Sequence, residues 1–102
     1  MKVIYTTIAN EEQAESIAQT LLQDKLVACI NMWPITSLYT WKEKFEKSSE
    51  IAMFLKTTAE CHDLVYKRLK ELHTYECPAI ITINVSKTDL DFMQWVQTQT
   101  KP

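Results

Sequence analysis

Hydrophobic positions along the chain change their period several times, and each change predicts a different element. Residues 3–8 are rich in β-favouring side chains, and Asn10 follows as a helix N-cap with Gln13 at the capping-box position. Apolar residues then recur at helical spacing up to about Lys25: Ala14, Ile17, Ala18, Leu21 and Leu22. This pattern predicts a strand followed by an amphipathic helix.

The next stretch, residues 26–47, reads as two extended segments broken by Pro34. Proline cannot donate a ladder hydrogen bond, so the stretch should lie at a sheet edge or bend out of the sheet there. We expect its arms to form a hairpin with a turn near Lys42 and Glu43, and a long edge strand with large aromatic side chains predicts a covering partner. One face of the second segment is expected to carry Ile35, Tyr39, Trp41 and Phe45.

The second half of the chain repeats the strand and helix patterns. Residues 51–55 form a continuous apolar run, which predicts a central strand covered on both faces. Thr58 is expected to cap a second helix that ends near His73. After Pro78, alternation over residues 81–86 predicts a last strand with one polar face, and a short helix is expected from about Asp89.

The resulting order is β-α-β-β-α-β with an added C-terminal helix, the ferredoxin-like arrangement of the α+β class. Right-handed crossovers place both main helices on one face of a four-stranded antiparallel sheet. A length of 102 residues, of which 46% are hydrophobic, fits a single domain over residues 1–102. The second face of the sheet is left without a cover of its own.

Composition excludes several classes of function. Eleven basic and 13 acidic residues, well mixed, give a net charge of -2 and no general attraction to nucleic acid or to an anionic membrane surface. Glycine is absent, which excludes the glycine-rich phosphate loops. An odd set of three cysteines, with no signal-peptide core and no run of membrane-spanning length, predicts reduced thiols in a cytoplasmic protein.

The run HTYECP holds the most concentrated chemical group, His73, Tyr75 and Cys77. One interpretation is a soft metal site, because imidazole and thiolate are good ligands for copper and zinc. The alternative is a helix C-terminus at which His73 caps carbonyl groups, Tyr75 packs and Cys77 starts a strand.

Enzymatic chemistry has weaker support. A Cys-His enzyme needs a nucleophile, a base and an orienting group in contact, and no local signature indicates them. Cys29 lies in an apolar run, where a cysteine usually acts as a small hydrophobe. Lys56, at the end of the central strand, is expected to pack its stem while its ammonium reaches water, although an anionic ligand is an alternative. We therefore expect a protein that is not an enzyme.

Six pieces, in order, carry a resemblance over essentially the whole chain: YTT at 5–7, KLVACIN at 25–31, SLYTWKEK at 37–44, LKTT at 55–58, ELHTYECP at 71–78 and FMQWV at 92–96. In these the sequence resembles the CutA divalent-cation tolerance family. The resemblance implies a homotrimer of ferredoxin-like subunits, in which the sheets meet and the long second strand reaches a neighbour. It also implies a role in tolerance of copper and other divalent metals.

This sequence departs from the family pattern at several positions. The turn that is usually Glu-Gly-Lys is Lys42-Glu43-Lys44 here. The bacterial metal-site positions carry Thr6, Leu72 and His73, so only the histidine is retained, and Cys77 is a hypothetical replacement ligand.

Two functional hypotheses follow. The first is a cytoplasmic homotrimer for divalent metal (copper) tolerance, with metal bound at His73 and Cys77. The second is a sensor similar to the PII signalling trimers, which binds an anionic metabolite in a cleft between subunits. The residues expected to line that cleft are Cys29, Tyr39, Trp41, Lys56 and Tyr75. In either case Pro34 is expected to mark where the strand leaves its own sheet for a neighbour's.

Overall fold

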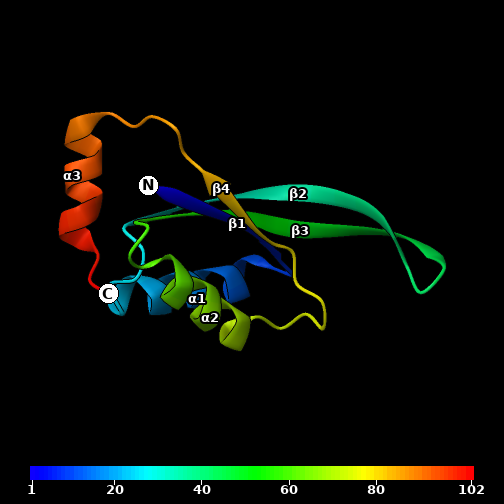
Figure 1. The fold of residues 1–102 in the computed structure, drawn as a ribbon. Helices are drawn as coiled ribbons and strands as arrows, with labels where there is room; N and C mark the ends of the chain where they lie inside the picture. Colours follow the sequence, from blue (N-terminus) through cyan, green and yellow to red (C-terminus); the bar gives the residue numbers. More distant parts are fainter.

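The computed structural model describes residues 1–102 as four strands and three helices (Figure 1). The strand order is β2-β3-β1-β4, and all neighbouring strands are antiparallel. Helices α1 and α2 lie side by side under one face of this sheet. The predicted α+β, ferredoxin-like fold is confirmed. The elements are β1 (Lys2–Ile8), α1 (Glu11–Gln23), β2 (Cys29–Trp41), β3 (Lys44–Thr57), α2 (His62–Leu72), β4 (Ile80–Asn84) and α3 (Leu90–Gln99).

The hydrophobic core lies between the sheet and helices α1 and α2. Alternate residues of the two central strands point into it, and the register partners Ile4 and Leu55 are both fully buried. The predicted stripe of α1 meets them through Ile17 and Leu21, and α2 contributes Val65 and Leu69. Burial of one such side chain stabilises the fold by about 1.5–3 kcal/mol, so this layer holds the sheet and the helices together.

The helix boundaries follow their capping residues. The side chain of Asn10 accepts a hydrogen bond from the Gln13 amide at 2.9 Å, as predicted. The last helix begins after Asp89, as expected, and the Asp89 side chain accepts a hydrogen bond from the Phe92 amide at 3.2 Å. The prediction for Thr58 is wrong by one turn: its hydroxyl accepts from the Cys61 amide at 3.2 Å, and α2 begins only at His62. None of the three helices has the length and apolarity that crossing a membrane requires.

Strands β2 and β3 form one long hairpin that extends beyond the four-stranded sheet (Figure 1). Their pairing runs without interruption from Cys29 opposite Lys56 to Trp41 opposite Lys44. The expected break at Pro34 is therefore wrong, because β2 is an edge strand and a proline there need not disturb the pairing. Strand β1 ends opposite Ile51, the partner of Pro34, so the hairpin is only two strands wide beyond that pair.

The face expected for Phe45 is also wrong. The hairpin turns through only two residues, Lys42 and Glu43, which adopt left-handed φ angles of 51° and 67°. Phe45 consequently pairs with Thr40, and its side chain lies on the opposite face from Trp41, where it is 73% exposed. A two-residue turn makes odd positions on one strand share a face with even positions on the other.

The sheet face opposite α1 and α2 is largely uncovered, and it is apolar. The ring of Phe54 meets Tyr5 at 5.9 Å and Trp33 at 5.0 Å between centroids. Ile81 and Ile83 of β4 lie on this same open face, so the apolar side of the last strand points away from the helices. Helix α3 stands at one end of the sheet and leaves the rest open (Figure 1). Residues 51–55 lie in a central strand, as expected, and Ala52 is fully buried on the open face, but no second layer covers this face within the subunit.

Candidate functional site

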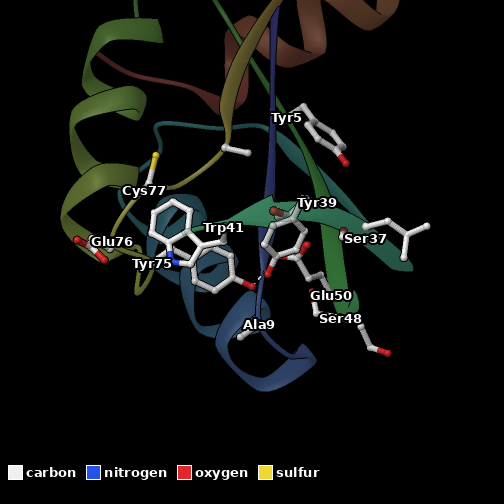
Figure 2. Close-up of a pocket in the computed structure, with 14 residues that line it drawn as sticks. Tyr5, Ala9, Ser37, Tyr39, Trp41, Ser48, Glu50, Tyr75, Glu76 and Cys77 are labelled. Atoms are coloured by element: carbon white, nitrogen blue, oxygen red, sulfur yellow. Dashed lines mark hydrogen bonds between the residues drawn. The ribbon is translucent and has the colours of Figure 1, made fainter. Parts of the chain in front are cut away.

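The main cavity, of about 720 Å³, lies between the β2–β3 hairpin, the end of β1 and the loop that joins α2 to β4 (Figure 2). The hairpin contributes Tyr39, Trp41 and Glu50, and the loop contributes Tyr75 and Cys77. The hairpin reaches the loop because both of its strands continue past the end of β1. The cavity therefore depends on a contact between segments far apart in the sequence.

Glu50 is the central charged group of the cavity. Its carboxylate is nearly buried, and it accepts a hydrogen bond of 2.6 Å from the hydroxyl of Tyr75 (Figure 2). Burial alone would raise the pKa of Glu50. The hydroxyl groups of Ser37, Tyr75 and Thr7, with a smaller effect of His73, outweigh burial and leave the pKa of Glu50 below its ordinary value. The side chain is therefore a carboxylate at neutral pH.

The surroundings of Tyr75 keep its phenol protonated. Burial, the hydrogen bond to Glu50 and the negative charge of that carboxylate all raise the pKa of the Tyr75 phenol, and Tyr39 adds a further small increase. A phenol with a raised pKa is a permanent donor over the physiological range. Tyr75 thus holds the Glu50 carboxylate in a fixed orientation at the base of the hairpin extension.

His73 connects the same loop to β1. Its Nε2 lies 2.9 Å from the carbonyl oxygen of Thr7, which can only accept, so Nε2 carries the proton. Its Nδ1 accepts a hydrogen bond from the Tyr75 amide at 3.2 Å. Burial lowers the pKa of His73 more than the Thr7 carbonyl and Glu50 raise it, which favours this neutral form. Both ring nitrogens are occupied within the subunit.

The predicted metal residues lie close in sequence, but the structure gives them different surroundings. Cys77 is an exposed, free thiol on the cavity wall, whereas His73 makes the two hydrogen bonds just described. Thr6, at a metal position of the family pattern, is fully buried under the helices. The subunit contains no group of three or more His, Cys, Asp or Glu side chains placed to hold a metal ion.

Of the five residues expected in one cleft, the structure brings three together. Tyr39, Trp41 and Tyr75 line the cavity. Cys29 and Lys56 are partners at the opposite end of the hairpin, where the Lys56 ammonium lies 5.7 Å from the centre of the Phe92 ring in α3. Within one subunit these two residues belong to a separate region.

Sequence reasoning missed the carboxylates of the site. Glu50 and Glu76 both line the cavity, together with the hydroxyl groups of Ser37 and Ser48, and no lysine, arginine or histidine does. A signal was present for Glu50, because it directly precedes the apolar run 51–55 on the face that carries Tyr39 and Trp41. A charged side chain at such a border is either solvated or paired, and only the tertiary structure decides which.

Comparison with known proteins identifies the family. Residues 2–99 match the family model described as CutA1 divalent ion tolerance protein. The divalent-cation tolerance protein CutA of Pyrococcus horikoshii is 38% identical over 99% of both chains. A crystal structure of CutA1 from Pyrococcus horikoshii superposes with a TM-score of 0.97 at 36% identity, over the whole of both chains.

A second structure adds a functional description. The PII-like protein CutA from Nostoc sp. PCC 7120, in apo form, has a TM-score of 0.93 at 29% identity and covers 99% of this chain and 98% of its own. The resemblance drawn from the sequence is therefore confirmed. The chain belongs to the CutA1 divalent ion tolerance protein family.

Proposed function

We propose that this protein works in divalent-cation tolerance as a homotrimer in the cytoplasm, with a small-ligand cavity in each subunit closed by a neighbour. The observation that carries the proposal is the open, apolar face of the sheet. The number of subunits follows from the family, and the cytoplasmic location is supported by the three free thiols.

The exposed side chains of this face form a continuous apolar surface. Ile81 is 51% exposed, and Trp33 and Ile83 are exposed to about the same degree as Tyr39 and Trp41 on the hairpin. Contiguous apolar surface of this kind marks an interaction site. A second copy of the same sheet face is a suitable cover, since stacked sheets bury alternate side chains of both partners.

Light scattering on the purified protein tests the trimer. We expect a mass of three times the 11.9 kDa chain, and we expect Ile81→Glu to lower it because the substitution places a charge in the interface. Leu64→Glu, on α2, is the matched control: Leu64 is exposed to a similar degree but lies on the helical side. A monomeric wild type at micromolar concentration would rule out the assembly, and an equal effect of both substitutions would rule out this face.

Metal binding is proposed at His73 and Cys77, because imidazole and thiolate suit copper. Cys77 is accessible, and a metal at Nδ1 of His73 would replace the hydrogen bond from the Tyr75 amide. Copper(I) and copper(II) titrations of wild type, His73→Ala and Cys77→Ser test this site. Each substitution should weaken binding by about tenfold or more if the residue is a ligand. Equal, weak copper binding by all three proteins would show that neither His73 nor Cys77 is a ligand.

A ligand sensor is the second candidate, and the PII-like description of the Nostoc protein favours it. The predicted anionic metabolite is less well supported than a cation. The cavity has two carboxylates and no basic side chain in its wall, and Lys56 lies elsewhere. A thermal-shift screen that includes both anions and cations distinguishes them, since a ligand at 100 times its dissociation constant stabilises by about 2.7 kcal/mol.

A further inference from the structure

The geometry points to a binding site for an organic ammonium ion in the main cavity, formed by the Glu50 carboxylate and the rings of Tyr39, Trp41 and Tyr75. This inference deepens the proposed function by naming the class of ligand. The residues that carry it all belong to one subunit, and the proposed neighbour would close the cavity over them.

Charge is the first reason. Glu50 and Glu76 give the cavity wall two carboxylates. Neither takes part in an ion pair, because the pairs in the subunit join His62 to Asp63 and Arg68 to Asp24. A nearly buried carboxylate held by neutral hydroxyl groups retains its full negative charge, and a cationic ligand would complete the site.

The aromatic wall decides which kind of cation fits. Tyrosine and tryptophan faces attract a cation within about 6 Å of the ring, and substituted ammonium ions match such walls because their alkyl groups also contact the rings. In the single subunit Tyr39 and Trp41 remain 45% and 40% exposed. The Lys42 ammonium lies 5.8 Å from the centre of the Trp41 ring, so a bound cation would share or replace that contact. Figure 2 shows the rings of Tyr39, Trp41 and Tyr75 and the Glu50 carboxylate among the side chains that line the cavity.

A divalent metal ion fits the same wall less well. Hard cations need six or more oxygen ligands around one point, and the two carboxylates of the cavity wall belong to no group of three or more His, Cys, Asp or Glu side chains placed to hold a metal ion. The volume instead accommodates a molecule of several heavy atoms.

Choline and 3,3-dimethyl-1-butanol test the inference directly. They have the same shape, but the second has carbon in place of the charged nitrogen. Titration calorimetry of the wild type should show choline binding at least about tenfold more tightly than the neutral alcohol. Comparable affinity for the two, or no binding of choline to a correctly folded protein, would overturn the inference.

Three variants locate the site. Glu50→Gln keeps the shape of the side chain and should abolish the preference for choline. Glu46→Gln, on the same strand and face but outside the cavity wall, should retain that preference fully. Trp41→Leu should weaken choline binding by about tenfold with little effect on the alcohol. An equal response to Glu46→Gln and Glu50→Gln would show a general effect of surface charge and overturn the site.

Circular dichroism and light scattering on each variant keep the two proposals separate. A monomeric wild type that still prefers choline would contradict the trimer and support the cation site. A trimer that does not distinguish choline from the alcohol would contradict the cation site alone. A folded Glu50→Gln protein that keeps the full preference would also contradict it.

Discussion

The phenol of Tyr75 donates a 2.6 Å hydrogen bond to the carboxylate of Glu50, and this contact joins the loop before β4 to the β2–β3 hairpin. The two residues are 25 positions apart in the sequence. The pair fixes the loop against the hairpin near the point where the four-stranded sheet ends. It therefore stabilises the fold and shapes the cavity at the same time.

Removal of the Tyr75 hydroxyl should destabilise the protein measurably. Tyr75→Phe leaves a nearly buried carboxylate without its closest donor, and we expect a loss of about 1–2 kcal/mol in the free energy of unfolding in urea. Tyr39→Phe removes a hydroxyl from the same cavity wall but from an exposed ring, and it should cost less than about 0.5 kcal/mol. Equal losses would mean that the Tyr75–Glu50 contact contributes no more than a solvated hydroxyl.

Acid should destabilise the protein in two ranges of pH. His73 has a lowered pKa when folded, so below pH 6.5 the unfolded chain binds a proton more readily, and stability falls. Glu50 also has a lowered pKa, so its contribution is present above pH 4.5 and is lost as the pH falls through the folded value. Urea midpoints measured between pH 8 and pH 3 should fall in both ranges.

His73→Gln separates these two effects. The substitution should remove the decrease that begins near pH 6.5 and leave the one below pH 4.5. A midpoint that stays constant from pH 8 to pH 5 in the wild type would contradict the assignment to His73.

The hairpin turn carries conformational strain that glycine would relieve. Glu43 adopts a φ angle of 67°, a left-handed conformation that costs a non-glycine residue about 1 kcal/mol, and the CutA family pattern has glycine in this turn. Glu43→Gly should therefore raise stability by about 0.5–1 kcal/mol, seen as a higher thermal midpoint. Glu46→Gly, two residues into β3, should lower it because glycine weakens a strand.

Two buried threonines give a matched pair of opposite predictions. The hydroxyl of Thr57 donates to the Leu26 carbonyl at 2.6 Å, so Thr57→Val should destabilise by about 1–3 kcal/mol. The hydroxyl of Thr6 is buried without a partner, so Thr6→Val should leave stability unchanged or raise it by up to about 1 kcal/mol. Chemical denaturation of both variants checks the pair. A larger loss for Thr6→Val would indicate an unrecognised partner, such as an ordered water.

Local patterns were enough to predict most of the fold. Asn10, Asp89 and the stripe of α1 specify helix ends and faces through contacts within a few residues. The errors arose where a face depends on geometry beyond one element. Phe45 changed sides because the turn has two residues, and Ile81 faces outward because α1 and α2 cover only the other side of the sheet.

The site was harder to predict than the fold. The sequence predicts that the large aromatic residues Tyr39, Trp41 and Tyr75 line one cleft, and the structure brings them together. Glu50 did not, because its importance depends on a loop that is distant in the sequence. Lys56 is expected in the same cleft by the similarity to the PII trimers, but the antiparallel register places it at the opposite end of the hairpin from the cavity.

The early end of β1 has a consequence for the motions of the subunit. Residues 44–50 of β3 precede the part that pairs with β1, so they have only β2 as a neighbour. About half of their backbone amides therefore have no strand to bond to. Such amides open and exchange their hydrogen with solvent faster than those at the centre of the sheet. The Glu50 side of the cavity thus belongs to the least protected part of the sheet, and a ligand or neighbouring subunit that binds there would slow amide exchange first in residues 44–50.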